Sequence, residues 1–467
     1  MEINSNFNVN LNSITEFARV MVPESLKEKI FIEGIETSSE ITIKIKIKDK
    51  EKSFSYKNLG DKVDDQKSTM IKVLLTIFYE KNYSWGCLMG VRPTKIVRRL
   101  LDLKCDIPEI REILKNFYLI KDEKINLMID VALKEEQFLN RKMINIYIGI
   151  PFCPTKCTYC SFASYEITGG VGKYYKKFIE TLLEEIKIVG RFLSENKYKI
   201  ESIYIGGGTP SVLENNDIKY MLKTICENID MSNVKEFTFE GGREDTLTKE
   251  KLQIIKEHQV NRISINPQTF NEATLDRINR KLNKEHFDEM YNISKELGFI
   301  INMDLIIGLP GENTEDIIYT LETMKGYQID NLTIHSLAFK RASNLFKEDR
   351  NRNNIDKDRV MGEIIKLMSY KNMRPYYLYR QKNIIEWGEN VGYSLDGKES
   401  IFNIEMIEEN QCTIGLGGGA ITKIISKDEN NRDYIKRIIN PKDPTLYMRE
   451  MENRTIEKFE YLKSHKI

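Results

Sequence analysis

The chain has 467 residues, 41% of them hydrophobic, which is enough for a large core with one or two smaller lobes. Lys and Arg number 71 and Asp and Glu 70, so a net charge of +1 gives no electrostatic support for binding nucleic acid or an anionic membrane. No stretch approaches 18 apolar residues, and the Asn-rich start lacks the pattern of a signal peptide, so we expect a cytoplasmic protein without a membrane-spanning segment. Seven cysteines, an odd number, favour metal binding or catalysis over a disulfide framework.

Residues 1–140 are expected to form a separate N-terminal α/β lobe. Isoleucine alternates with polar residues over 41–47, which predicts a half-buried strand, and its lysines suit a sheet edge. Residues 54–56 fit a paired strand. A helical pattern begins at Lys67, and Pro93 suits the first position of another helix. The lobe shows no catalytic pattern of residues.

Residues 144–375 alternate short apolar strands with amphipathic helices. This alternation predicts right-handed crossovers and a parallel sheet, so the fold class is α/β. Six such units would give an open (β/α)6 barrel, and eight would close it. Residues 376–467 are expected to form a C-terminal α+β lobe with a glycine-rich turn at 415–419. The six predicted strands are 144–150, 202–206, 235–240, 261–265, 300–307 and 331–336.

Three cysteines, Cys153, Cys157 and Cys160, lie in the loop after the first of these strands. Thiolates suit iron–sulfur clusters or zinc, but structural zinc normally takes four protein ligands, and all four histidines are distant in sequence. Three ligands on a four-iron cube leave one iron open, where S-adenosylmethionine (SAM) can bind and be split to a 5′-deoxyadenosyl radical. A zinc site completed by a distant residue is the alternative. The other cysteines fit buried thiols.

Polar groups for holding SAM follow the later strands. The turn at 206–210 contains three glycines, whose carbonyls suit the ammonium group of methionine. Ribose hydroxyls suit the carboxylates of Glu240 and Asp304, which are costly to bury alone, and Arg280 balances their charge. The alternative is an internal polar network with no ligand. Within each strand, polar residues two positions apart share one face of the sheet. These residues are Thr238, Glu240, Ser264, Asn266, Gln268, Asn302 and Asp304.

Several of these motifs together resemble the oxygen-independent coproporphyrinogen III oxidase family of radical SAM proteins. They are residues 147–160, the turn 206–210, Gln268 with Phe270 and Asn271, and Asp304 followed by 308–310. Residues 90–95, 377–383 and 389–393 are similar to its HemZ-type branch.

The resemblance implies a partial (β/α)6 radical SAM barrel. It also implies oxidative decarboxylation of two propionates of coproporphyrinogen III, giving protoporphyrinogen IX in haem biosynthesis. The cofactors would be a [4Fe–4S] cluster on Cys153, Cys157 and Cys160, and SAM, with Tyr147 in the catalytic set. Ile421 is a weaker SAM contact. The implied SAM contacts are Tyr147, Tyr159, Gly207, Gly208, Thr209, Glu240, Gln268, Arg280, Asp304 and Ala338.

The implied partners are a tetrapyrrole substrate and an external electron donor, either flavodoxin or ferredoxin, with no nucleic acid or membrane. Cations that suit the substrate propionates are Lys340, Arg341, Arg374 and Arg380.

The sequence departs from the decarboxylating members at two positions. Phe162 replaces a fourth cysteine, and Gly149 replaces a histidine. Two other functions therefore stay open. One is a haem-binding or haem-transfer protein, for which His335 is the well-placed axial ligand, although residues 389–393 lack the histidine of the haem-chaperone motif. The other is a radical SAM enzyme acting on another substrate, such as haem.

Overall fold

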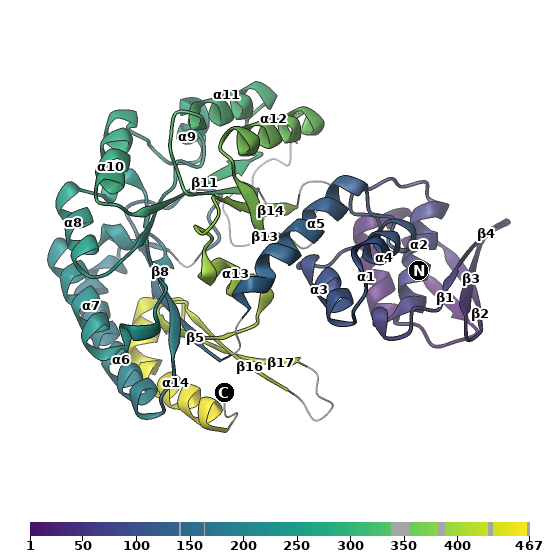
Figure 1. The fold of residues 1–467 in the computed structure, drawn as a ribbon, viewed down its shortest axis with the longest axis horizontal. Helices are drawn as coiled ribbons and strands as arrows, with labels where there is room; N and C mark the ends of the chain where they lie inside the picture. Colours follow the sequence, from purple (N-terminus) through teal and green to yellow (C-terminus); the bar gives the residue numbers. More distant parts are fainter. Residues whose placement is uncertain (140–141, 163, 338–354, 382–387, 428–432, 465–467) are drawn as a thin grey trace. The chain divides into compact units, whose positions relative to one another are not determined.

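The computed structural model describes residues 1–139, 142–162, 164–337, 355–381, 388–427 and 433–464. The chain divides into two compact units (Figure 1). The first comprises Met1–Glu136 with Leu378–Asn390, and the second comprises Gln137–Tyr377 with Val391–Ile467. Among the described residues, no helix has the length and apolar character needed to cross a bilayer.

The first unit contains a four-stranded sheet in the order β1-β2-β3-β4. Its strands are β1 (Glu2–Ser5), β2 (Lys29–Glu36), β3 (Glu40–Ile47) and β4 (Lys50–Lys57). The predicted strand at 41–47 is β3, with its isoleucines buried. The expected edge position is wrong, because β2 and β4 pair with β3 on both sides and its lysines occupy the open face. The helices of this unit are α1 (Leu11–Met21), α2 (Gln66–Phe78), α3 (Thr94–Asp102), α4 (Ile107–Glu112) and α5 (Asp122–Glu135).

Buried charges tie the returning segment Leu378–Asn390 into the first unit. The Trp85 indole N–H donates to Glu389 Oε2 at 2.7 Å, and Lys124 pairs with the other carboxylate oxygen. Arg380 lies over the Trp85 ring at 4.6 Å and donates to the Leu88 carbonyl at 2.6 Å. Arg380 is buried in this network. The expectation that Arg380 offers a cation to the substrate is therefore wrong, because its guanidinium is bound to Trp85 and the Leu88 carbonyl.

The second unit contains all six predicted barrel strands as parallel neighbours. They are part of an eleven-stranded sheet in the order β13-β14-β12-β11-β10-β9-β8-β5-β15-β16-β17, whose two ends do not pair with each other in the described residues. This arrangement is the expected partial barrel. The six strands are β5 (Ile144–Ile150), β8 (Ile200–Gly207), β9 (Glu236–Gly242), β10 (Arg262–Ile265), β11 (Ile300–Ile307) and β12 (Asn331–Ser336).

Apolar runs such as that of β5, which is buried on both faces, form the centre of the sheet, as expected for a parallel sheet covered by helices. Figure 1 shows the connecting helices on the outer side of these strands. Some helices begin with side-chain caps; α11, for example, has a capping box between Asn313 and Asp316. The connecting helices are α6 (Tyr175–Glu195), α7 (Asn215–Asn228), α8 (Lys249–Glu257), α9 (Glu272–Arg277), α10 (Lys284–Glu296), α11 (Thr314–Met324) and α12 (Lys357–Tyr370).

The C-terminal segment joins the barrel sheet at both ends. β14 is antiparallel to β12, while β15 is parallel to β5 and carries the hairpin of β16 and β17. The division into units therefore differs from the three expected segments, since backbone pairing joins Val391–Ile467 to the barrel. The elements are β13 (Arg374–Arg380), β14 (Glu389–Ser394), α13 (Ile401–Glu408), β15 (Cys412–Gly417), β16 (Ile421–Lys427), β17 (Asp433–Ile439) and α14 (Pro444–Ser464).

Candidate active site

The cysteine loop, residues 151–166, leaves the carboxyl end of β5. Two short strands, β6 (Phe152–Cys153) and β7 (Tyr165–Glu166), pair in parallel and close the loop. The Cys153 and Cys157 side chains are buried, and Cys160 is half-buried. The loop therefore presents three thiols at the end of the barrel where parallel α/β folds place their chemistry.

The three thiols act on one another electrostatically. Burial, reinforced by the Cys160 and Cys157 thiols, raises the pKa of Cys153 to about 11. A hydrogen bond from Thr209 Oγ1 at 3.4 Å and the charge of Arg243 oppose this rise. In the described part of the chain, no three His, Cys, Asp or Glu side chains converge on one metal-ion position. Three soft thiol donors on one loop nevertheless match the ligand type of an iron–sulfur cluster.

The glycine turn after β8 packs directly against the cysteine loop. The N–H groups of Gly208 and Thr209 donate to the carbonyls of Ile150 and Phe152, each at 2.7 Å. A Cβ on Gly208 would lie 3.0 Å from Cys153 Sγ and 2.4 Å from the Phe152 carbonyl oxygen. Glycine is therefore required here, and the predicted contacts Gly207, Gly208 and Thr209 lie beside the first cysteine.

Segment 278–280 holds the other side of the loop. The Ile278 carbonyl accepts from the Thr158 N–H at 3.1 Å, and the Asn279 amide donates to the Lys156 carbonyl at 3.0 Å. Arg280 is buried and acts electrostatically on Tyr159 and on the Cys157 thiol. Tyr159 and Arg280, both predicted SAM contacts, thus lie together near the second cysteine.

Aromatic rings and one carboxyl line the barrel interior. Tyr147 on β5 stacks with Tyr204 on β8 at 6.1 Å and with Phe402 on α13 at 5.9 Å. Glu240 accepts hydrogen bonds from Tyr204 and from the Gly207 backbone. Burial, followed by the charge of Asp304, raises the pKa of Glu240 to about 8. Glu240 is therefore mostly protonated at neutral pH and can donate a hydrogen bond.

Asp304 on β11 has the opposite protonation preference. Its Oδ1 accepts from Asn302 Nδ2 at 2.9 Å, and its Oδ2 lies 3.7 Å from His335 Nε2. Burial alone would raise the pKa of Asp304, but His335, Asn302 and Thr333 outweigh it and leave the pKa below its ordinary value. Two acids of the barrel interior thus differ in charge at neutral pH, one neutral and one ionised.

Several buried polar atoms without a protein partner lie on β10, on β11 and in the chain between these strands. Leaving such an atom unpaired costs about 1–3 kcal/mol, so a cluster of them indicates a site for a polar ligand. A molecule with amino, carboxylate and hydroxyl groups, such as SAM, fits this donor and acceptor set. The atoms are Ser264 Oγ, Asn266 Oδ1, Gln268 Oε1, Asn302 Oδ1 and Arg280 Nε.

Gln268 has a backbone conformation that suits a ligand contact. Its φ is +66°, in the left-handed region that side chains rarely adopt. Its N–H donates to the Asp304 carbonyl at 3.0 Å, and its own carbonyl accepts from the Ile306 N–H at 2.9 Å. These two bonds hold the strained residue beside β11.

The remaining predicted residues lie less centrally. Ile421 is the first residue of β16. Its backbone lies 2.7 Å from the position that a Cβ on Gly415 would occupy. Gly415 in turn pairs with Tyr147 in the register of β15 and β5. Phe162 is 69% exposed, so its ring is not part of the core. Arg374 is exposed at the start of β13. Ala338, Lys340 and Arg341 fall outside the described residues.

Sequence reasoning missed Arg243, the residue that follows β9. It is 5% exposed, and its Nη1 donates to Thr155 Oγ1 in the cysteine loop at 2.8 Å. Arg243 lies shortly after the predicted strand 235–240, and a charged residue close to the carboxyl end of a parallel strand is the signal that could have found it.

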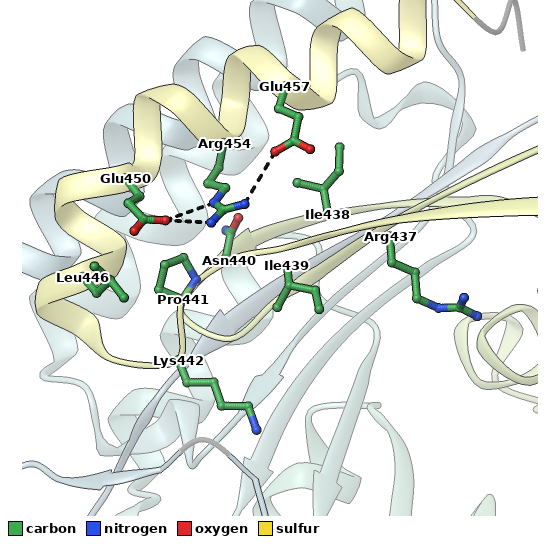
Figure 2. A pocket seen from close by; sticks show the side chains of 10 residues that line it. All are labelled: Arg437, Ile438, Ile439, Asn440, Pro441, Lys442, Leu446, Glu450, Arg454 and Glu457. Carbon is green, nitrogen blue, oxygen red and sulfur yellow. Dashed lines mark hydrogen bonds and ion pairs between the residues drawn. The ribbon is translucent and has the colours of Figure 1, made fainter.

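A separate cavity of about 400 Å³ lies between β17 and α14 (Figure 2). Arg454 points toward it and pairs with Glu450 at 2.8 Å and Glu457 at 3.6 Å. No predicted site residue lines this cavity. It is therefore distinct from the cysteine loop.

The sequence and the fold are similar to those of known proteins. The profile of the radical SAM superfamily matches residues 147–324. A solved structure described as coproporphyrinogen III oxidase (HemN) from Escherichia coli, a radical SAM enzyme, matches with a TM-score of 0.52. The match covers 69% of this chain and 73% of that one at 19% identity, so it shows the shared fold alone. Radical SAM proteins use a [4Fe–4S] cluster and SAM, and these are the cofactors of this chain.

Two curated relatives lie nearer in sequence. The oxygen-independent coproporphyrinogen-III oxidase-like protein HemZ of Bacillus subtilis is 39% identical over 81% of this chain and 77% of its own length. The haem chaperone HemW of Buchnera aphidicola subsp. Schizaphis graminum is 29% identical over 68% of this chain and 88% of its own. The chain therefore belongs to the radical SAM superfamily, in the HemZ family of proteins similar to oxygen-independent coproporphyrinogen III oxidase.

Proposed function

We propose that the protein is a radical SAM oxidoreductase that converts two propionates of coproporphyrinogen III to vinyl groups. The 39% identical HemZ relative, named as coproporphyrinogen-III oxidase-like, supports this substrate class. The observation that carries the proposal is the contact between the cysteine loop and the glycine turn, next to buried polar atoms that lack partners. In this proposal, SAM and the three thiols share one end of the barrel.

In this proposal, Cys153, Cys157 and Cys160 hold a [4Fe–4S] cluster. When bound and reduced, the cluster supplies the electron that splits SAM into methionine and a 5′-deoxyadenosyl radical. The side chains of this chain bind and orient SAM. Carbonyls of the glycine turn accept from the methionine ammonium group, Asp304 accepts from a ribose hydroxyl, and Glu240 in its neutral form donates to one.

The balance of the reaction fixes its co-reactants. For each propionate, one hydrogen atom leaves the carbon adjacent to the ring, the bond to the carboxylate breaks with release of CO₂, and one electron leaves the substrate. Two vinyl groups therefore require two SAM molecules and an acceptor for two electrons. The electrons that start each cycle come from an external protein of the flavodoxin or ferredoxin class.

The second function to weigh is haem binding or transfer without turnover, which the 29% identical HemW relative favours. His335 is the axial ligand that such a function would use. Its Nε2 lies 3.7 Å from Asp304, and this contact would have to open for Nε2 to ligate iron. This competition makes the haem-binding function the weaker proposal.

The two functions are separated by one anaerobic experiment. Protein with a reconstituted cluster is incubated with SAM, a reductant and coproporphyrinogen III, and mass spectrometry follows the tetrapyrrole. The proposal predicts two successive losses of 46 mass units, about the mass of CO₂ plus two hydrogens per propionate. Unchanged coproporphyrinogen, together with tight haem binding that the substitution His335→Ala abolishes, would instead establish the haem-transfer function.

A further inference from the structure

We propose that Arg243 and Asp245 form a charged clamp on the cysteine loop, which positions the loop and sets the reduction potential of its cluster. The inference rests on the proposed function only in assuming that the loop carries a [4Fe–4S] cluster. Arg243 and Asp245 lie just after β9, outside the three cysteines and the SAM contacts that the resemblance implies. Both are therefore assigned here as positioning residues.

The geometry of the clamp is specific to arginine. Arg243 Nε donates to Asp245 Oδ1 at 3.0 Å, and Nη2 donates to Oδ2 at 2.5 Å. The remaining nitrogen, Nη1, donates to Thr155 Oγ1 at 2.8 Å. A planar guanidinium makes these three bonds at once, whereas the single nitrogen of lysine cannot reproduce the forked pair.

Thr155 is the point where the clamp holds the loop. It lies between Cys153 and Cys157, so its anchor acts on the spacing of the first two thiols. Segment 278–280 holds the neighbouring loop residues through their backbone, because it accepts from the Thr158 N–H and donates to the Lys156 carbonyl. The Arg243 hydrogen bond reaches the Thr155 side chain from the β9 side of the loop. Groups around a metal ligand orient that ligand, so this bond should help to orient the neighbouring cysteines.

The charges of the clamp also reach the cluster site. Arg243 is 5% exposed, so solvent screens its charge weakly, and that charge acts on the Cys153 thiol. A nearby cation stabilises the reduced, more negative form of a cluster and raises its potential, and a nearby anion does the reverse. The Asp245 side chain, 36% exposed, partly cancels the arginine. Removal of the Arg243 charge and removal of the Asp245 charge should therefore shift the reduction potential of the cluster in opposite directions.

Three variants separate positioning from charge. Arg243→Gln removes the cation, Asp245→Asn removes the anion at nearly constant shape, and Thr155→Val removes only the hydroxyl. Each protein is reconstituted anaerobically with iron and sulfide, without tetrapyrrole. The midpoint potential is measured by titration with optical and electron paramagnetic resonance detection, and cluster loss to a chelator is followed by absorbance.

We expect Arg243→Gln to shift the potential to a more negative value and Asp245→Asn to a less negative one. Arg243→Gln and Thr155→Val should each lose iron to the chelator several-fold faster than wild type. The protein that carries both Arg243→Gln and Thr155→Val should lose iron no faster than Arg243→Gln alone, because each substitution removes the same hydrogen bond. Arg243→Lys should restore the potential but not the iron retention. Arg262→Gln is the matched control, since Arg262 is equally buried but bonds to Asn331 and Glu236 away from the loop.

Potentials that shift in the same direction in Arg243→Gln and Asp245→Asn would overturn the charge role. Iron loss at the wild-type rate in Thr155→Val would overturn the positioning role, even if Arg243→Gln failed to fold. A wild-type protein that binds no cluster would refute the proposed function itself. The two failures are therefore distinguishable.

Discussion

The carbonyl oxygen of Gly418 lies 2.6 Å from the position that a Cβ on Gly149 would occupy. The Gly418 N–H also donates to the Gly149 carbonyl at 3.0 Å. This close approach joins the turn after β15 to the end of β5, two residues before the cysteine loop begins. The position that holds a histidine in the decarboxylating proteins this chain resembles therefore has no room for a side chain here.

Gly149→Ala should lower the free energy of unfolding by about 1–3 kcal/mol, because the new methyl group must displace backbone rather than a flexible side chain. Urea denaturation of the protein, followed by circular dichroism, measures the change. Gly170→Ala is the control, because nothing lies within 4 Å of its Cβ position. An equal loss in both variants would contradict the close approach.

Glu185 on α6 and Lys458 on α14 form an ion pair at 2.8 Å in which both side chains are fully buried. Lys458 also donates to the Gly415 carbonyl at 2.7 Å, and Glu185 accepts from the Gly417 N–H at 2.8 Å. Lys458→Met leaves the carboxylate buried without its cation and should cost about 3–5 kcal/mol of stability.

The matched variant is Lys223→Met, which breaks the exposed pair with Glu227 and should cost about 0–1 kcal/mol. Chemical denaturation of both proteins at pH 7 gives the comparison. A difference of less than about 1 kcal/mol between them would mean that Lys458 does not hold α14 to β15.

Glu405 on α13 should make stability depend on pH. Burial raises the pKa of Glu405 to about 8, above its ordinary value of 4.5. The folded protein therefore binds this proton more tightly than the unfolded chain, so the stabilisation is complete below pH 4.5 and is lost as the pH rises toward 8. The slope from this one group is about 1.4 kcal/mol per pH unit.

Glu405→Gln removes that slope, so the variant should gain stability relative to wild type between pH 5 and 8. Denaturation midpoints at four pH values in this range test the expectation. Glu460→Gln, which changes an exposed carboxyl, is the control. Parallel pH profiles for Glu405→Gln and wild type would show that the carboxyl is ionised in the folded protein.

The opposite protonation of Glu240 and Asp304 predicts different effects on SAM binding. Glu240→Gln keeps a neutral hydrogen-bonding group and should leave the affinity within about threefold of wild type. Asp304→Asn replaces a charged acceptor and should cost about 1.5–3 kcal/mol of binding free energy. Anaerobic calorimetry with SAM measures both, and equal losses would contradict the assigned charges.

Much of the barrel was predictable from the sequence because local pattern and tertiary structure agree there. The strand at 300–307 and that at 331–336 match β11 and β12 residue for residue. The alternation of side chains along a strand also predicted that Asn302 and Asp304 lie on one face, and the two side chains are hydrogen-bonded.

Other features depend on contacts that sequence pattern does not encode. The lysines of β3 suggested an edge, but strand order depends on long-range pairing. Arg380 looked like a free cation, yet it lies on Trp85, nearly 300 residues earlier in the chain. Arg243 and Thr155 are also far apart in sequence, and only the fold brings them together.

The central claim is that Cys153, Cys157 and Cys160 hold the cluster that cleaves SAM. The most direct test measures iron content and 5′-deoxyadenosine formation in reconstituted protein under anaerobic conditions, for wild type and for Cys157→Ala, with Cys226→Ala as the control thiol. The account predicts that Cys157→Ala loses both cluster absorbance and 5′-deoxyadenosine, while Cys226→Ala retains both. Normal SAM cleavage by Cys157→Ala would contradict it.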